Sequence, residues 1–356
     1  MIDTPEQRHA TLFLRLLLDE GAPPVGDAAV DWRLLLALAR ENSVLVRLTA
    51  RLEQGGLRPP TFVTAEAQRA GARARAVLAV VRQIGERCAR HEIEFLFPKA
   101  LQHFPDSGGD LDLLVLTPDR NVDALILEGL AATHRARDLR DHIAGTAIYW
   151  LRDSGLVMDV HHGRLGFVGE FPSYAAALIR ERRRRRVVAG EEWVVPAPED
   201  QLLLQGMSRV AVRRSFSIAD VVATVAIVRA NRLDWRYLVS VARAMGVLPG
   251  LSCYLTYVEQ IHRALCDRDL LPPEAPRDLT HDDWGRVAFR AGRYRFPTIG
   301  VRNRLYWRQL GTAAGRGDWP SVSRLCLVPV VVVAVSLGLV GREPAAATAA
   351  AALGAS

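Results

Sequence analysis

Hydrophobic residues recur every three to four positions through most of the first ninety residues. This spacing is typical of helices that bury one face. Asp31 precedes one of these patterns and is of a helix-capping residue type, so we expect it to cap that helix. The predicted helices cover residues 11–18, residues 31–40, a stretch with Leu45, Leu48 and Leu52, and residues 65–91. We interpret residues 1–91 as a helical scaffold, because periodic apolar faces usually form a core.

From Glu92 onward the apolar residues alternate with polar ones, which is the period of a strand. Between the strands, Pro98 and the Pro118-Asp119 pair are placed to begin two helices. The predicted strands cover residues 93–97, 110–116, 146–151 and 156–161, with a hairpin signal at Asp153-Ser154-Gly155. Residues 92–197 are therefore predicted to form a small mixed sheet with helices on one side.

Helical periodicity returns in residues 198–343. A strand at 192–195 precedes this region. Its predicted elements are a helix from Pro198, helices near 218–229, 234–245 and 251–265, and a polar linker at 272–283. We expect the Ala-rich tail, residues 344–356, to be poorly ordered. The predicted fold class is α+β, a small mixed β-sheet core flanked by N-terminal and C-terminal helical regions.

The most apolar stretch of the chain is residues 325–340, which contains Pro329. It is shorter than the roughly 20 apolar residues that a membrane-spanning helix needs. We expect a buried or surface-docked helix and no stable membrane span. Peripheral contact with a membrane through this stretch is the alternative.

Composition places the chain among ordinary globular proteins, with 356 residues, 49% hydrophobic and 24% charged. The net charge of +7 suits a partner that carries phosphate. The four cysteines are scattered without a C-x-x-C pair, which argues against a zinc site or a disulfide framework. Residues 1–20 lack the features of a signal peptide, so we expect a cytoplasmic location.

Two aspartates open the predicted strand at residues 110–116. Side chains alternate along a strand, so Asp110 and Asp112 point to one face, about 6–7 Å apart. Neighbouring carboxylates repel each other, and a divalent cation removes that conflict. Mg²⁺ is the usual occupant of a carboxylate pair that also meets substrate phosphates. Solvated acids at a strand end are the simpler alternative.

A third acid, Asp159, lies on the predicted strand 156–161. Val157, Asp159 and His161 share one face of this strand. If the strand lies beside residues 110–116, Asp159 joins Asp110 and Asp112. Three acids around one site are what two-metal phosphoryl or nucleotidyl transfer requires, and the third can act as the base.

Several short phrases follow one another in order between residues 30 and 250. They are Asp31-Trp32-Arg33-Leu34-Leu35, Phe97-Pro98-Lys99-Ala100, Asp110 to Val115, Val157 to His161, Pro198-Glu199-Asp200-Gln201-Leu202-Leu203, Asp220-Val221 and Leu233-Asp234-Trp235. Their order resembles a bacterial family of uncharacterised nucleotidyltransferases within the DNA polymerase β-like nucleotidyltransferase superfamily. Each phrase alone is weak, and the order makes the resemblance specific.

The resemblance implies transfer of a nucleoside monophosphate, AMP in particular, from a nucleoside triphosphate to a hydroxyl or amine. The acceptor is a small molecule, a peptide or an RNA, and the sequence leaves it open. The implied catalytic and metal-binding residues are Asp110, Asp112 and Asp159, with Mg²⁺ or Mn²⁺ as the metal. The implied nucleotide-binding residues are Lys99, Ala100, Gly108, Gly109 and His161.

Two other functions stay open at this point. Lys99-Ala100 replaces the Gly-Ser turn that is usual in the superfamily, so the chain can be a catalytically inactive binding or accessory protein. The arginine-rich segment, residues 180–186, predicts either a solvated helix end or contacts with the phosphates of an RNA. The oligomeric state cannot be read from the sequence.

Overall fold

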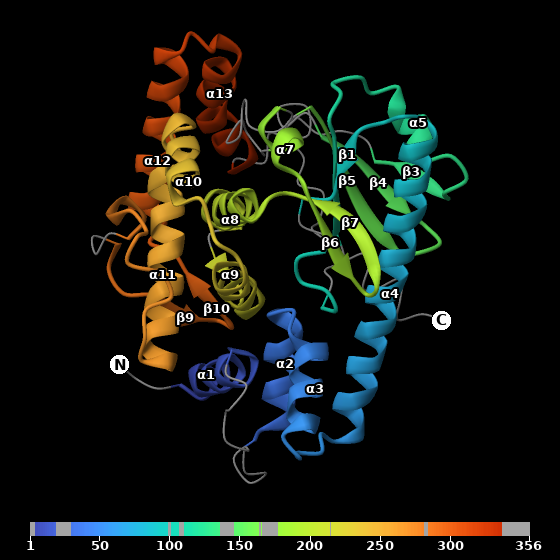
Figure 1. Cartoon of the computed structure of the whole chain (residues 1–356), viewed down its shortest axis with the longest axis vertical. Coiled ribbons are helices and arrows are strands. Elements are labelled where there is room, and N and C mark those ends of the chain that lie inside the picture. Colours follow the sequence, from blue (N-terminus) through green and yellow to red (C-terminus); the bar gives the residue numbers. More distant parts are fainter. Residues whose placement is uncertain are drawn as a thin grey trace.

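The computed structural model describes residues 4–18, 30–98, 101–106, 110–135, 146–163, 165, 177–213, 215–280 and 284–336. Its helices and small sheets confirm the predicted α+β class (Figure 1). The predicted tail at 344–356 and the predicted helix start at Lys99 and Ala100 lie outside the described residues.

Four helices form the N-terminal region: α1 (Pro5–Leu18), α2 (Trp32–Glu41), α3 (Leu45–Gln54) and α4 (Thr61–Arg90). Asp31 caps α2 as predicted, because its side chain accepts hydrogen bonds from the backbone N–H groups of Arg33 and Leu34. The 30-residue helix α4 extends from α3 to the sheet (Figure 1). Its first turns pack in the helical core and its second half packs on the sheet.

The main sheet has five strands in the order β1-β2-β5-β4-β3. The strands are β1 (Phe95–Leu96), β2 (Asp110–Val115), β3 (Ala132–His134), β4 (Thr146–Leu151) and β5 (Leu156–His162). Strands β2 and β5 pair in parallel and the other pairs are antiparallel, which confirms a mixed sheet.

The helix predicted after Pro118 is shorter than expected. Helix α5 covers only Val122–Ile126, and Gly129 adopts a left-handed backbone conformation three residues later. A left-handed residue cannot continue a right-handed helix, so the chain turns there and enters β3, a strand that the sequence pattern did not predict.

The two faces of this sheet differ in chemistry. Leu111, Leu113 and Val115 of β2 pack with Met158 and Val160 of β5 against α4 and α5. The aspartates of β2 alternate with these leucines and so point to the other face. The sheet therefore buries one face under helices and presents its acids on the other.

The C-terminal region continues with a hairpin and a second helical layer. Its elements are α7 (Ala177–Arg182), β6 (Arg184–Val188), β7 (Glu191–Val195), α8 (Pro198–Met207), the π-helix η2 (Ser208–Arg213), β8 (Ser215–Phe216), α9 (Ile218–Ala230), α10 (Trp235–Ala244), α11 (Leu248–Cys266), η3 (Arg277–Leu279), β9 (Ala288–Arg290), β10 (Arg293–Arg295), α12 (Thr298–Gly315) and α13 (Trp319–Ser336). Among the described helices, none is long and apolar enough to cross a membrane.

One prediction for this region is wrong. The arginine-rich segment is not one helix end, because α7 stops at Arg182 and residues 184–188 form a strand paired with β7. The predicted linker at 272–283 contains η3, whose Leu279 is fully buried. Short strands and single turns carry too few residues for a hydrophobic period to reveal them.

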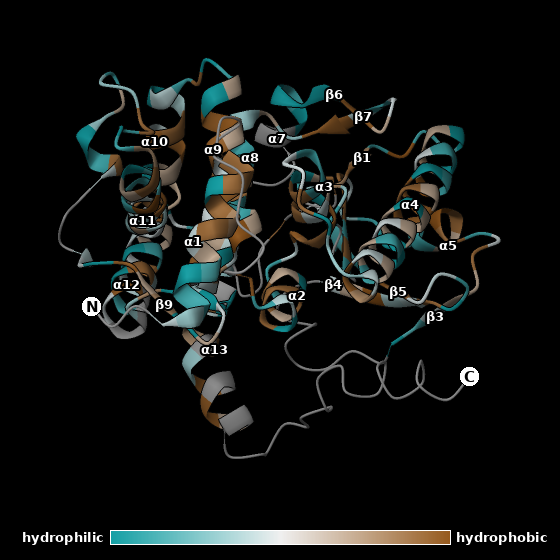
Figure 2. Cartoon of the chain, turned by 90° about the horizontal axis from the view of Figure 1, so that it is seen from below, coloured by the Kyte–Doolittle hydropathy of each residue, from teal (hydrophilic) through white to brown (hydrophobic). Residues whose placement is uncertain are grey.

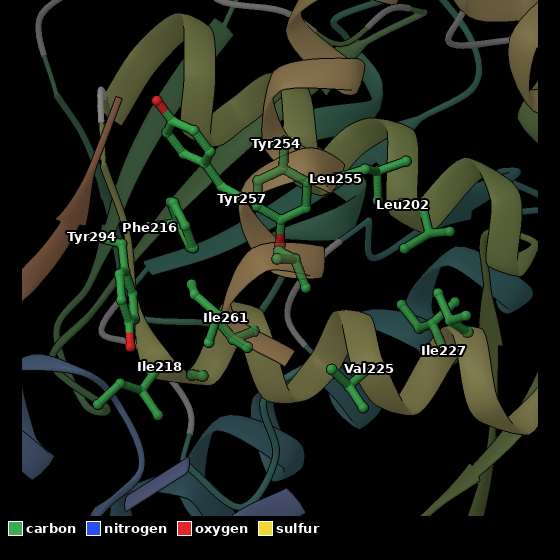
Figure 3. Close-up of a cluster of buried hydrophobic side chains, with 14 of the residues drawn as sticks. Leu202, Phe216, Ile218, Val225, Ile227, Tyr254, Leu255, Tyr257, Ile261 and Tyr294 are labelled. Carbon is green, nitrogen blue, oxygen red and sulfur yellow. The ribbon is translucent and has the colours of Figure 1, made fainter. Parts of the chain in front are cut away.

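An aromatic cluster joins the second half of the chain (Figure 3). The ring of Phe216 stacks on that of Tyr294 at 5.1 Å between centroids, and meets the ring of Tyr254 edge-on at 5.6 Å. These contacts hold β8 and β10 against α11. Helix α9 is mainly apolar (Figure 2), and most of its side chains are buried, as expected for a helix packed among others.

Asn42 connects three segments that are distant in the sequence. Its side-chain amide donates to the carbonyl oxygens of Leu38 and Gly292, at 2.9 and 2.8 Å. Its side-chain oxygen accepts from the backbone N–H of Ile218 at 3.0 Å. Asn42 is fully buried, so it ties α2 to the β9–β10 turn and to α9 without help from water.

We expect Asn42→Ala to lower the free energy of unfolding by roughly 2–4 kcal/mol, because buried partners are left without hydrogen bonds. The matched control is Asn231→Ala, an exposed helix-end asparagine with one backbone contact. We expect it to cost less than about 1 kcal/mol. Urea unfolding followed by circular dichroism measures both, and equal losses would contradict the role given to Asn42.

Candidate active site

The three predicted acids meet on one face of the main sheet. In the parallel β2–β5 pair, Asp112 lies directly opposite Asp159, and Asp110 lies two residues earlier on the same face as Asp112. The structure thus brings together residues that are 47 positions apart in the chain (159 minus 112). Their convergence follows from a parallel register that the sequence pattern alone left open.

Asp159 has an unusual electrostatic environment. Burial, followed by the negative charges of Asp112 and Asp110, raises its pKa to about 6, although His161 and Arg135 oppose the rise. One of its carboxylate oxygens is buried and has no hydrogen-bond partner. Such an oxygen is costly to keep in a folded protein, and a bound cation would satisfy it.

His161 lies beside the acids as predicted. Its Nε2 atom is 3.4 Å from the Oδ1 atom of Asp112. The ring is mostly buried, so this contact orients the carboxylate of Asp112. Lys99, Ala100, Gly108 and Gly109, the other predicted nucleotide-binding residues, lie outside the described residues.

A polar cavity of about 530 Å³ opens beside Asp110 and Asp112. Its walls combine acids, serines, four arginines and one histidine drawn from both halves of the chain. The basic residues are His103, Arg209, Arg213, Arg293 and Arg295, and the serines are Ser43, Ser208, Ser215 and Ser217. A cavity with this lining suits an anionic ligand that approaches a metal-binding acid pair.

The inner wall of this cavity is fixed by a buried ionic cluster. Asp220 is fully buried and lies 2.9 Å from Arg209 and 3.3 Å from His103. Burial alone would raise the pKa of Asp220, but Arg209 and His103 outweigh it and hold that pKa well below its usual range. Arg209 is thereby anchored, while its Nε–H, buried, has no hydrogen-bond partner.

Arg213 belongs to the same π-helical turn, η2, and also lines the cavity. Its guanidinium is 3.3 Å from a carboxylate oxygen of Asp110. Both side chains are more than half exposed, so the pair is weak and open to exchange for a ligand. π-Helical turns often occur at functional sites.

The outer wall comes from β10. Arg293 and Arg295 are two residues apart on this strand and so project to the same side. Arg293 contacts Glu41, with 3.5 Å between its Nε and the Oε1 atom. Arg295 makes no contact with a carboxylate in the part of the chain that the structure describes, and its nearest partner is the carbonyl oxygen of Arg290.

The sequence pattern did not identify the basic residues that line this cavity. No role was argued for His103 or Asp106, yet His103 pairs with Asp220, and Asp106 accepts hydrogen bonds from Val46 and Arg47 at the start of α3. Arg209 follows the predicted helix from Pro198. Its nearness to one of the phrases that resemble the family is the one signal that could have identified it. The arginines of β10 gave no signal, because arginine is common throughout the chain.

The residues present fit a divalent cation that is shared with substrate. No three described His, Cys, Asp or Glu side chains form a complete protein-only metal site. Mg²⁺ usually keeps waters and binds through one or two carboxylates plus substrate phosphates, so a complete cage is not required. The hard oxygens of Asp112 and Asp159, one without a partner, match that preference.

Comparison with known proteins identifies a family. A family model described as an uncharacterised nucleotidyltransferase matches residues 28–263. No curated protein and no solved structure is similar enough to match the chain. The matched stretch contains the acids and η2, and it ends before β9 and β10.

We expect Asp159→Asn to stabilise the metal-free protein at pH 7. The raised pKa of Asp159 means that the folded state holds its proton better than the unfolded state does, so stability is lost as pH rises from about 4 through about 6. Asparagine removes this loss, with an expected gain of roughly 1–3 kcal/mol at pH 7 and none at pH 4.

Urea unfolding in EDTA at both pH values tests this expectation. Asp153→Asn is the matched control, since Asp153 is exposed in the turn that leads into β5. It should change the unfolding free energy by less than about 0.5 kcal/mol. A loss of stability in Asp159→Asn at pH 7 would mean that the carboxylate is not strained there.

Proposed function

The chain belongs to the uncharacterised nucleotidyltransferase family, as its sequence predicted, and we propose that it is an active, Mg²⁺-dependent enzyme of this class. It transfers NMP from an NTP to a hydroxyl or amine acceptor. The observation that carries this proposal is the register of β2 and β5, with Asp112 opposite Asp159 beside a cavity lined with arginines. We place the reaction in the cytoplasm, where NTP is plentiful and the four free cysteines stay reduced.

Asp110, Asp112 and Asp159 hold the metal in this proposal. When bound, a divalent cation neutralises the carboxylates and stabilises the charge that develops on the phosphates. Asp159 takes the proton from the acceptor hydroxyl or amine while the acceptor atom bonds to the α-phosphorus. The bond from that phosphorus to the bridging oxygen breaks, and pyrophosphate leaves.

The arginines of the cavity bind the triphosphate. Arg209 is held rigidly by Asp220, so it presents a fixed cation at the inner wall. Arg213 and Arg295 are more exposed and can turn toward the β- and γ-phosphates. All NTPs share these groups, so the basic wall supports NTP binding in general, and ATP as donor remains the expectation drawn from the family.

The structure gives less support to the alternative in which the arginine-rich segment, residues 180–186, binds RNA. Arg180 and Arg183 both pair with Glu94, and Arg185 pairs with Glu192. Arg182 pairs with Glu199 and stacks on the ring of Tyr237. The pair of Arg182 with Glu199 is mostly buried and links α7 to α8, whereas the other pairs are exposed and weak.

We expect Asp112→Asn to lower kcat by about a hundredfold or more, because the metal loses a charged ligand at the reacting phosphate. The assay follows release of pyrophosphate from each of the four NTPs, with Mg²⁺ and a panel of small hydroxyl and amine compounds, peptides and RNA. Asp153→Asn serves as the exposed carboxylate control and should retain full activity. Binding of Mg²⁺-NTP without any turnover would instead favour the inactive accessory protein.

We expect Arg295→Gln to raise KM for the NTP about tenfold with a smaller change in kcat, because a phosphate contact made before and during the reaction is lost. Arg232→Gln, on the exposed turn before α10, is the matched control and should leave KM unchanged. An unchanged KM in Arg295→Gln would remove β10 from the phosphate site.

A further inference from the structure

A second cavity, of about 820 Å³, lies between α10, α11 and α12. These helices are on the far side of α8 from the main sheet in both views (Figures 1 and 2). The second cavity shares no lining residue with the cavity beside Asp110. More than half of its lining comes from Asp278 and from residues 284–312, which lie beyond the stretch matched by the family.

The charge of this second cavity is positive. Arg243, Arg304 and Arg308 line it, and Asp278 is its one acidic lining residue. Asp278 hydrogen-bonds Arg243. Arg304 and Arg308 have no carboxylate partner among the residues that the structure describes. Two unpaired guanidinium groups on neighbouring turns of α12 suit a phosphate.

Two tryptophans give the same cavity flat apolar walls. The guanidinium of Arg304 lies over the ring of Trp284, 5.1 Å from its centroid. Trp307, one turn further along α12 than Arg304, is 65% exposed. An exposed indole beside unpaired arginines is suited to stack on a planar aromatic group that is attached to an anion.

The floor of the cavity carries buried donors without partners. Ser252 is 1% exposed, and its hydroxyl makes no hydrogen bond. The indole N–H of Trp284 is likewise buried and unpaired. Ser252 lies near the start of α11, whose first turn also lines the cavity. Most buried donors are paired in folded proteins, so the Ser252 hydroxyl and the Trp284 indole point to a ligand with several acceptors.

We propose that the second cavity binds a free mononucleotide. The phosphate is held by Arg304 and Arg308, the buried donors of Ser252 and Trp284 bind acceptors of the ligand, and the base stacks on Trp307. A mononucleotide has an anionic phosphate for the arginines, a flat base for Trp307 and hydrogen-bond acceptors for the buried donors. The proposal does not depend on the transfer reaction, because it uses none of the catalytic acids.

Isothermal titration calorimetry of the full chain with AMP, in EDTA, tests the proposal. We expect Trp307→Ala and Arg304→Gln each to weaken AMP binding about tenfold, through lost stacking and a lost phosphate contact. Trp307 is exposed, so its removal leaves the fold intact. Trp307→Phe keeps an aromatic face, and we expect it to stay within about threefold of the parent chain.

Arg232→Gln is the control, since Arg232 is exposed and lines neither cavity, and it should leave AMP binding in EDTA unchanged. Adenosine and inorganic phosphate, tested separately, should each bind at least about tenfold more weakly than AMP. Three results would overturn the proposal: no AMP binding at millimolar concentration, parental affinity in both Trp307→Ala and Arg304→Gln, or phosphate alone binding as tightly as AMP.

Discussion

Repulsion among three carboxylates on neighbouring strands governs the centre of this structure. Asp112 and Asp159 are opposite one another in a parallel pair, and Asp110 shares their face. Such a group resists joint ionisation, and burial, followed by the charges of Asp112 and Asp110, raises the pKa of Asp159. His161 beside Asp112, the exposed Arg213 beside Asp110 and Arg135 near Asp159 oppose this repulsion. In the proposed function, a metal ion and its phosphate ligands add further positive charge at the same place.

Asp220 is a single buried acid that lies deeper in the molecule and holds basic side chains in place. It accepts from the backbone and hydroxyl of Ser217, which caps α9, and it pairs with Arg209 and His103. The buried Gln205 donates to its backbone carbonyl and also to the hydroxyl of Tyr254. The inner wall of the cavity beside Asp110, which carries Arg209, is therefore positioned by the same residues that fix α8, α9 and α11 to each other. The geometry of the proposed phosphate site depends on the helical core.

Much of the fold and part of the site could be predicted from the sequence, for physical reasons. Alternation along a strand places Asp110 and Asp112 on one face, and long apolar periods mark α2, α4 and α9. Strand pairing and register depend on contacts between distant segments, so the sequence alone could not establish that Asp159 lies beside Asp112. The strand at residues 184–188 and the turn at Gly129 are too short to leave a period. Arg293 and Arg295 contribute through a two-residue β8–β10 contact that no local pattern encodes.

The link from Asn42 to the β9–β10 turn has a consequence for any shortened form of this chain. The carbonyl of Gly292 accepts from the side chain of Asn42, and the rings of Tyr294 and Phe216 stack, so residues after 263 complete the packing of residues before it. A chain cut at residue 263, where the family match ends, would lose one hydrogen-bond acceptor of the buried Asn42 and would uncover the ring of Phe216. The matched segment and the packed unit are therefore different lengths of chain.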